Sequence, residues 1–295
     1  MTNHNKGLLA GLMAVLIWSG FILASRAGGV SELNTFDVIA IRYGTCATLV
    51  LPIWWLWHRF PFWQRRYVLL AMIGGIAYAL TTFFGFQQAP ASHAAILLPG
   101  LMPVFIGLAA WLFAHERPMA MQLAGMALVV LAVMILIVDL VLTPGFSFGL
   151  GHLAFMAGAL CWALMAGLVK RWQISPWETT ITLAVVTAAI YLPVYVVGLP
   201  KSLHLASASE ILLQAVYQGF LATIVQMVLF VYAVRQLGAS QMGSLMALVP
   251  VLAGLAAIPL FGEPASVALI VALVLGSGGV WLANTKIPMM KRRWQ

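Results

Sequence analysis

The sequence predicts an all-α membrane protein with ten transmembrane helices, arranged as two inverted five-helix repeats. Three observations lead to this prediction. Of the 295 residues, 63% are apolar and only 7% are charged, whereas about a quarter of the residues of a soluble domain are charged. The apolar residues form blocks of about 20, the length with which a helix crosses the hydrocarbon layer. Several strings of residues also occur twice, once in each half of the chain.

Ten blocks are long enough to span a membrane. They lie near residues 7–25, 35–57, 67–86, 92–114, 120–139, 149–170, 177–198, 208–234, 239–260 and 265–284. The connections between them are short, so we expect no soluble catalytic domain. The alternation with a period of two residues that is typical of membrane barrels is not seen.

Positive charges predict the orientation in the membrane. If the N-terminus is cytoplasmic, the outer side of the membrane holds three of the 15 Lys and Arg residues, namely Arg26, Arg42 and Lys201. The inner side holds the rest, which are Lys6, Arg59, Arg65, Arg66, Arg117, Lys170, Arg171, Arg235, Lys286, Lys291, Arg292 and Arg293. Cytoplasmic loops are enriched in Lys and Arg. We therefore expect a multi-pass protein of the cell inner (plasma) membrane with both termini in the cytoplasm, and we do not read the charge of +8 as nucleic-acid binding.

The repeated strings divide the chain. PVFIGLAAWLFAHE (103–116) returns as PVLAGLAAIPLFGE (250–263), and GLLAGLMAVLIWSGFILASR (7–26) resembles GHLAFMAGALCWALMAGLVK (151–170), with Arg26 opposite Lys170. ASHAAILLPGLMPV (91–104) likewise resembles ASQMGSLMALVPV (239–251). This pattern predicts a first repeat over 7–139 and a second over 147–285. A cytoplasmic N-terminus (1–6), a linker (140–146) and a basic cytoplasmic tail (286–295) complete the chain.

Five helices per repeat is an odd number, so equivalent helices cross the membrane in opposite directions. Transporters use such inverted repeats to form one substrate site near the bilayer midplane that is reached from either side in turn. We therefore expect a transporter rather than an enzyme. Helices one, three, four, six, eight and nine should surround its cavity.

The residues also resemble a known family. Tyr232, Ala233, Gly238, Ala239, Ser240, Pro250, Val251, Gly262 and Glu263, together with IRYG around Arg42, are similar to the EamA repeat of the drug/metabolite transporter superfamily. The resemblance covers both halves and is greatest to the YddG-type exporters of aromatic and other neutral amino acids. It implies an alternating-access exporter of small neutral metabolites.

Acidic residues are few and are expected outside the membrane core. The seven carboxylates are Glu32, Asp37, Glu116, Asp139, Glu178, Glu210 and Glu263, and all fall in loops or at span ends. Ionisable groups at membrane depth are costly unless they have a function. No catalytic residues, metal site or cofactor are therefore predicted.

Trp18 and its repeat equivalent Trp162 are the most informative candidates for substrate binding. Trp18 lies about 16 Å into the first span at 1.5 Å per residue, near the midplane, whereas tryptophan prefers the membrane interface. The two indoles form either the wall of a substrate cavity or ordinary packing within the bundle.

Uncharged polar residues at similar depth extend the candidate site. Tyr78 and Thr82 lie in the third span, and Gln226 lies opposite Tyr78 when the repeats are overlaid. Hydroxyl and amide groups suit a zwitterion, although they also bond within helix bundles. His93 begins the fourth span, either as an interfacial histidine in water or as a contact for a substrate carboxylate. Arg42 is expected to form a local ion pair or to reach the headgroups.

Prolines interrupt the fourth and ninth spans. Pro99 is a candidate for the cavity wall, and the repeat pair Pro103 and Pro250 is expected to act as a hinge. Glu116 and Glu263 each stand just before a proline, so we expect each to stabilise the N-terminus of the helix that follows it.

The prediction is thus an exporter of small neutral metabolites, amino acids including aromatic ones foremost, embedded in the lipid bilayer as a monomer. One alternative is a carrier of drug cations or of another metabolite. The other is a membrane enzyme or an assembly subunit.

Overall fold

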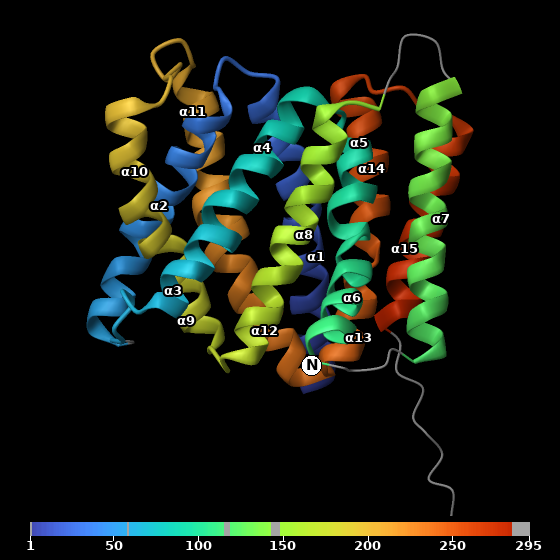
Figure 1. The fold of residues 1–295 in the computed structure, drawn as a ribbon, viewed down its shortest axis with the longest axis horizontal. Coiled ribbons are helices and arrows are strands. Elements are labelled where there is room, and N and C mark those ends of the chain that lie inside the picture. Colours follow the sequence, from blue (N-terminus) through green and yellow to red (C-terminus); the bar gives the residue numbers. More distant parts are fainter. Residues whose placement is uncertain (1, 58, 115–118, 143–147, 285–295) are drawn as a thin grey trace, which may run out of the picture.

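Ten helical spans form one bundle in the computed structural model, which describes residues 2–57, 59–114, 119–142 and 148–284 (Figure 1). Each span is at least 18 residues long and apolar enough to cross a membrane. The predicted number of spans is confirmed.

The first half comprises α1 (Asn3–Gly29), α2 (Thr35–Leu56), α3 (Arg65–Leu70), η1 (Ala71–Ala77), α4 (Tyr78–Gln88), α5 (Ala91–Ala95), η2 (Ile96–Gly100), α6 (Met102–Ala114) and α7 (Ala120–Leu142). The second half comprises α8 (Leu150–Arg171), α9 (Pro176–Ile181), η3 (Thr182–Val186), α10 (Thr187–Gly198), α11 (Ala208–Gln214), η4 (Ala215–Val225), α12 (Gln226–Leu237), α13 (Ala239–Met246), α14 (Leu248–Phe261) and α15 (Val267–Asn284). Segments labelled η are π-helical turns inside longer spans.

Local sequence explains where many helices begin. Asn34 and Asp37 form a reciprocal capping box at the start of α2, in which each side chain binds the other residue's backbone N–H. Ser175 with Glu178 and Ser207 with Glu210 do the same for α9 and α11. Each box satisfies N–H groups that have no partner inside the helix.

The helix packing follows the inverted repeat. α1 packs on α12 and α14, and α8, its equivalent in the second half, packs on α4 and α6, which are the equivalents of α12 and α14. α7 packs along its own equivalent α15, beside each other in Figure 1. Each of these contacts in one half therefore has an equivalent contact in the other half. This is expected for two copies of one unit that cross the membrane in opposite directions.

Glycines allow α7 and α15 to approach closely. A Cβ atom on Gly279 would lie 2.6 Å from the carbonyl oxygen of Gly125, whereas a Cβ on Gly278 would meet nothing within 4 Å. The glycine run at 275–281 could have served internal packing or a dimer contact, and Gly279 serves internal packing. Small residues commonly permit such crossings in membranes.

The fourth and ninth spans are both broken at equivalent places. α5 passes through the π-helical η2 and a turn at Leu101 into α6, and α13 passes through Ala247 into α14. Pro103 and Pro250 lie in the first turn of α6 and α14, where a missing N–H leaves no intrahelical bond unmade. The prolines therefore fix where the second segment of each span begins.

Two of the carboxylates that lie at span ends, Asp37 and Glu263, are buried inside the protein. Asp37 is fully buried, because it caps α2 and also accepts hydrogen bonds from Tyr195 and from the backbone N–H of Ser202. Glu263 is 6% exposed. Glu116 lies outside the described residues.

Candidate functional site

A cavity of about 1170 Å³ lies between the two halves. Its walls come from α1, η1, α6 and η2, α8, α12, α13 and α14, and also from α7 and α15. All six predicted spans contribute, but the fifth and tenth spans, α7 and α15, contribute as well, which we did not expect. These two helices pack closely on each other, and residues from both line the cavity.

The cavity reaches the end of the bundle where α1 begins, the lower end in Figure 1. Lys170, Arg171 and Gln173 at the end of α8, Gln122 at the start of α7 and Asn284 at the end of α15 lie along its mouth. At mid-depth it ends against Trp18, Trp162 and Pro99.

The two candidate tryptophans meet at the inner end of this cavity. The rings of Trp18 and Trp162 pack edge to face with their centroids 6.1 Å apart. Tyr78 packs behind Trp162 with a centroid separation of 5.1 Å. The repeat equivalents thus form one continuous aromatic wall across the interface between the halves, since aromatic pairs favour this geometry.

The rest of the wall is apolar and adaptable. Met102, Met126 and Met246 lie on three different spans, and Pro99, Pro103 and Pro250 line the cavity with them. Methionine is flexible and polarizable, so it fits ligands of varied shape. Sequence reasoning missed these methionines, as well as Gln122 and Asn284, because methionine and amide residues carry no spacing signal.

The other predicted polar residues lie behind the wall. Tyr78, Thr82 and Gln226 are buried and are not among the residues that line the cavity. Thr82 packs closely against Gly158 of α8, where a Cβ atom would lie 2.7 Å from the threonine hydroxyl. Their part in substrate binding stays a prediction.

The opposite end of the bundle is sealed by a buried ionic contact. The Glu263 carboxylate accepts hydrogen bonds from the backbone N–H groups of Ala91 (2.6 Å) and Ser92 (2.8 Å), and its Oε1 lies 3.8 Å from Nε of Arg26. Arg26 also donates from Nη1 to the carbonyl of Phe86 in α4. We call Arg26, Glu263 and the first turn of α5 the clasp. It joins the first, third, fourth and ninth spans.

The clasp corrects the expected role of Glu263. We predicted that it stabilises the helix that follows it, but it holds the N-terminus of α5 in the other half of the chain. The physical attraction is the one expected, a carboxylate at the positive end of a helix. The helix is a different one because the αL residue Gly262 ends α14 and turns the chain at this point.

His93 is not in water at the surface, and that expectation was wrong. It is 4% exposed, and its Nδ1 lies 3.0 Å from Nε2 of His152 at the start of α8. Arg42 forms no ion pair among the described residues. It donates to Gln218 in η4 at 2.9 Å, and its guanidinium lies over the ring of Phe21.

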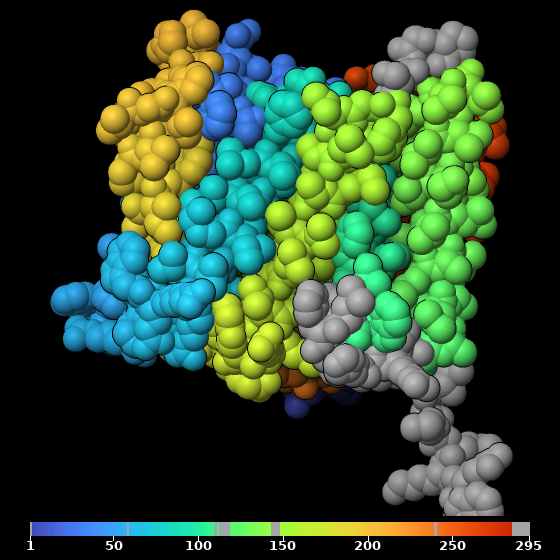
Figure 2. Space-filling model, in the orientation of Figure 1, coloured from blue at the N-terminus to red at the C-terminus, as the bar shows by residue number. Residues whose placement is uncertain are grey.

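At the sealed end, α4 and α8 also meet closely. Their side chains adjoin over the upper part of the face drawn in Figure 2, and a Cβ atom on Gly151 would lie within 3.0 Å of Gln88 and Ala89. The large cavity opens at the lower end.

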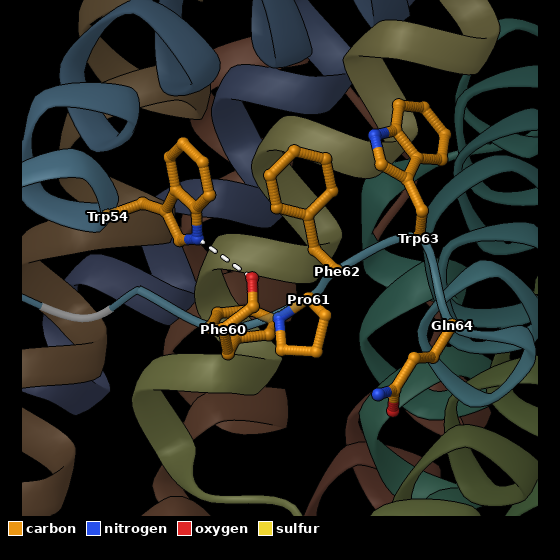
Figure 3. Close-up of a pocket in the computed structure, with 6 residues that line it drawn as sticks. All are labelled: Trp54, Phe60, Pro61, Phe62, Trp63 and Gln64. Carbon is orange, nitrogen blue, oxygen red and sulfur yellow. Dashed lines mark hydrogen bonds between the residues drawn. The ribbon is translucent and has the colours of Figure 1, made fainter.

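A second, smaller pocket of about 490 Å³ is formed by one stretch of chain. Trp54 and residues 60–64 surround it (Figure 3), and the indole N–H of Trp54 donates to the carbonyl of Phe60 at 3.2 Å. Gln64 supplies its single polar side chain. This pocket does not lie between the halves and is separate from the cavity.

No group of three or more His, Cys, Asp or Glu side chains in the described residues could hold a metal ion. The cavity offers its shape and its aromatic faces to a ligand.

Comparison with known proteins identifies the family. The model of the EamA-like transporter family matches residues 5–138 and again 149–285. No curated protein sequence matches the chain. One solved structure, titled only "Crystal structure of protein", shares the fold with a TM-score of 0.62, 22% sequence identity, and coverage of 95% of this chain and 96% of that chain. The chain therefore belongs to the EamA-like transporter family of the drug/metabolite transporter superfamily.

Proposed function

We propose that this transporter exports small neutral metabolites, amino acids with aromatic side chains foremost, by alternating access across the cell inner membrane. The observation that carries the proposal is the cavity between the halves. It offers the Trp18–Trp162 wall and three methionines to an apolar side chain.

Charge in the cavity supports a neutral cargo. None of the described lining residues is acidic, and the two basic ones, Lys170 and Arg171, lie at the mouth. A cationic drug would enter past two positive charges and find no carboxylate in the described wall. A zwitterion has no net charge and can pair its carboxylate and ammonium groups with hydrogen-bond donors and acceptors.

The observed arrangement corresponds to one of the two states that alternating access needs. The cavity is reached from the end where α1 begins, which the positive-inside rule assigns to the cytoplasm. The clasp closes the other end. Opening the clasp while the mouth closes, with the breaks before Pro103 and Pro250 as hinges, would carry the cargo outward.

The decisive experiment is counterflow in liposomes that contain the purified protein. Vesicles are loaded with unlabelled phenylalanine, and the entry of labelled phenylalanine is followed. We expect exchange that neutral amino acids inhibit and that Trp18→Ala and Trp162→Ala each reduce about fivefold, since losing one aromatic contact costs about 1 kcal/mol. Trp57→Ala is the matched control, because Trp57 is 73% exposed at the end of α2.

Two results would overturn the cargo assignment. One is the absence of exchange for every amino acid tested by a protein with a normal thermal transition. The other is stronger inhibition by a flat aromatic dication than by any amino acid, which would assign the cavity to drug cations through its aromatic faces.

A further inference from the structure

We propose that His93 and His152 form a proton-binding site at the sealed end, and that a proton bound there releases the contact between α5 and α8. The proposal rests on the alternating-access function but concerns a different ligand, a proton from the solution on the sealed side. It follows from the hydrogen bonds of the two rings.

Backbone contacts determine which ring nitrogens carry protons. The N–H of Gly149 donates to Nδ1 of His152 at 3.1 Å. Nδ1 is then an acceptor, so the neutral ring of His152 carries its proton on Nε2. Nε2 of His152 lies 3.0 Å from Nδ1 of His93. His152 is therefore the donor in this pair, and His93 is the acceptor with its own proton on Nε2.

This arrangement has no place for a further proton. A proton added to Nδ1 of His93 or to Nδ1 of His152 would set two N–H groups against each other, either between the two rings or between His152 and Gly149. In both cases one of the two hydrogen bonds must break. The link between α5 and α8 is thus compatible only with two neutral histidines.

The surroundings do not compensate for a positive charge. Both rings are 4% exposed, and the ring of Phe148 stacks on His152 at a centroid distance of 5.0 Å. Arg26 of α1 lies close enough to interact electrostatically with His93 and would repel its charged form. The carboxylate of Glu263 is the acid that faces α5 among the described residues, and it is already occupied by Arg26, Ala91 and Ser92.

Protonation therefore favours separation of the rings. When the upper end opens, each ring can reach water, and His93 accepts a proton on Nδ1 and becomes an imidazolium with two donors. An unperturbed histidine titrates between about pH 5 and pH 8. The sealed arrangement is favoured at the upper end of this range, and the open one gains population as the pH falls.

The test measures opening directly and needs no substrate. Spin labels are attached at Leu150→Cys and Val267→Cys, which are 70% and 80% exposed at the ends of α8 and α15 nearest the clasp, after replacing Cys46 and Cys161 with alanine. We expect a longer-distance population between the labels to grow reversibly from about pH 8 to about pH 5. The distance should stay constant if the histidines play no part.

Two variants distinguish proton binding from simple packing. Asn at 93 keeps an acceptor oxygen near the position of Nδ1, and Gln at 152 keeps a donor near the position of Nε2, yet neither titrates in this range. His93→Asn removes the proton acceptor and should therefore stay sealed at every pH. His152→Gln keeps the donor and leaves His93 able to bind the proton, so it should still open as the pH falls. His204→Gln, an exposed histidine in the described loop before α11, is the matched control and should respond like the parent.

The outcomes separate this proposal from the proposed function. No pH response in the parent, or an unchanged response in His93→Asn, would overturn the proton site. Phenylalanine counterflow measured on the same preparations reports on the cargo independently. Exchange without a pH-dependent distance would refute only the proton site, and a pH-dependent distance without exchange would refute only the amino-acid assignment.

Discussion

The two ends of this bundle are built from equivalent sequence yet are in opposite states. Arg26 and Lys170 occupy matching positions at the ends of α1 and α8. Arg26 is held in the clasp by Glu263 and Phe86, whereas Lys170 lines the mouth of the open cavity. The difference teaches that equivalent positions can have different partners at the closed end and at the open end. The same positions close one end while the other end is open.

Loss of the clasp should have the largest effect on the sealed end. Glu263→Ala leaves Arg26 without its carboxylate and removes the acceptor for Ala91 and Ser92. Removing one partner of a fully buried charged pair costs about 3–5 kcal/mol, and the loss here should be smaller because the Arg26 side chain is 17% exposed and also donates to the carbonyl of Phe86. We expect the thermal midpoint of the detergent-purified protein to fall clearly and the Leu150–Val267 label distance to lengthen at all pH values.

Glu32→Ala is the control for that prediction, because Glu32 is an exposed carboxylate on the same side. It should change neither quantity. If Glu263→Ala behaves like Glu32→Ala, then the clasp does not hold the sealed end.

A substitution at the crossing of α7 and α15 should have the next largest effect, a loss of stability. Gly279→Ala places a Cβ against the carbonyl of Gly125, and overpacking of this kind costs about 1–3 kcal/mol. Gly278→Ala in the next position meets nothing within 4 Å and should be close to neutral. Thermal unfolding of the two variants provides the comparison. Equal midpoints would mean that the helices can separate without loss.

The hinge residues should affect rate more than stability. Pro103→Ala or Pro250→Ala restores an N–H in the first turn of α6 or α14, which lets each broken span straighten. We expect phenylalanine counterflow to slow several-fold while the thermal midpoint changes little. Pro193→Ala in α10, outside the cavity, is the control. A similar slowing in that variant would show that loss of any helix proline has this effect.

Removing a charge at the mouth of the cavity should have the smallest effect on exchange. Arg171→Gln removes one exposed charge near the entrance, and rim charges alter the rate of approach more than the affinity. We expect phenylalanine exchange to change less than about twofold, and inhibition by a dication to increase, most visibly at low salt. An increase that persists at high salt would contradict an electrostatic cause.

Particular residues show how far sequence reasoning reached into the site. Trp18 and Trp162 were identified because tryptophan at mid-depth is unusual and because they match in the repeat, and both line the cavity. Pro99, Pro103 and Pro250 were identified because a break in a transmembrane helix must be accommodated, and they line it too. The contributions of α7 and α15 were not predicted, because a lining glutamine or asparagine has the same sequence signature as a packing one.

The sequence by itself determined the class of protein, the number of spans and the division into two halves. Hydrophobic length and repetition are properties of the chain alone, and the bilayer translates them directly into helices. Only the tertiary structure decided the partners across the halves. Glu263 with α5, His93 with His152 and Arg42 with Gln218 are each more than 50 positions apart, and the packing of the two repeats, not local spacing, brings them together.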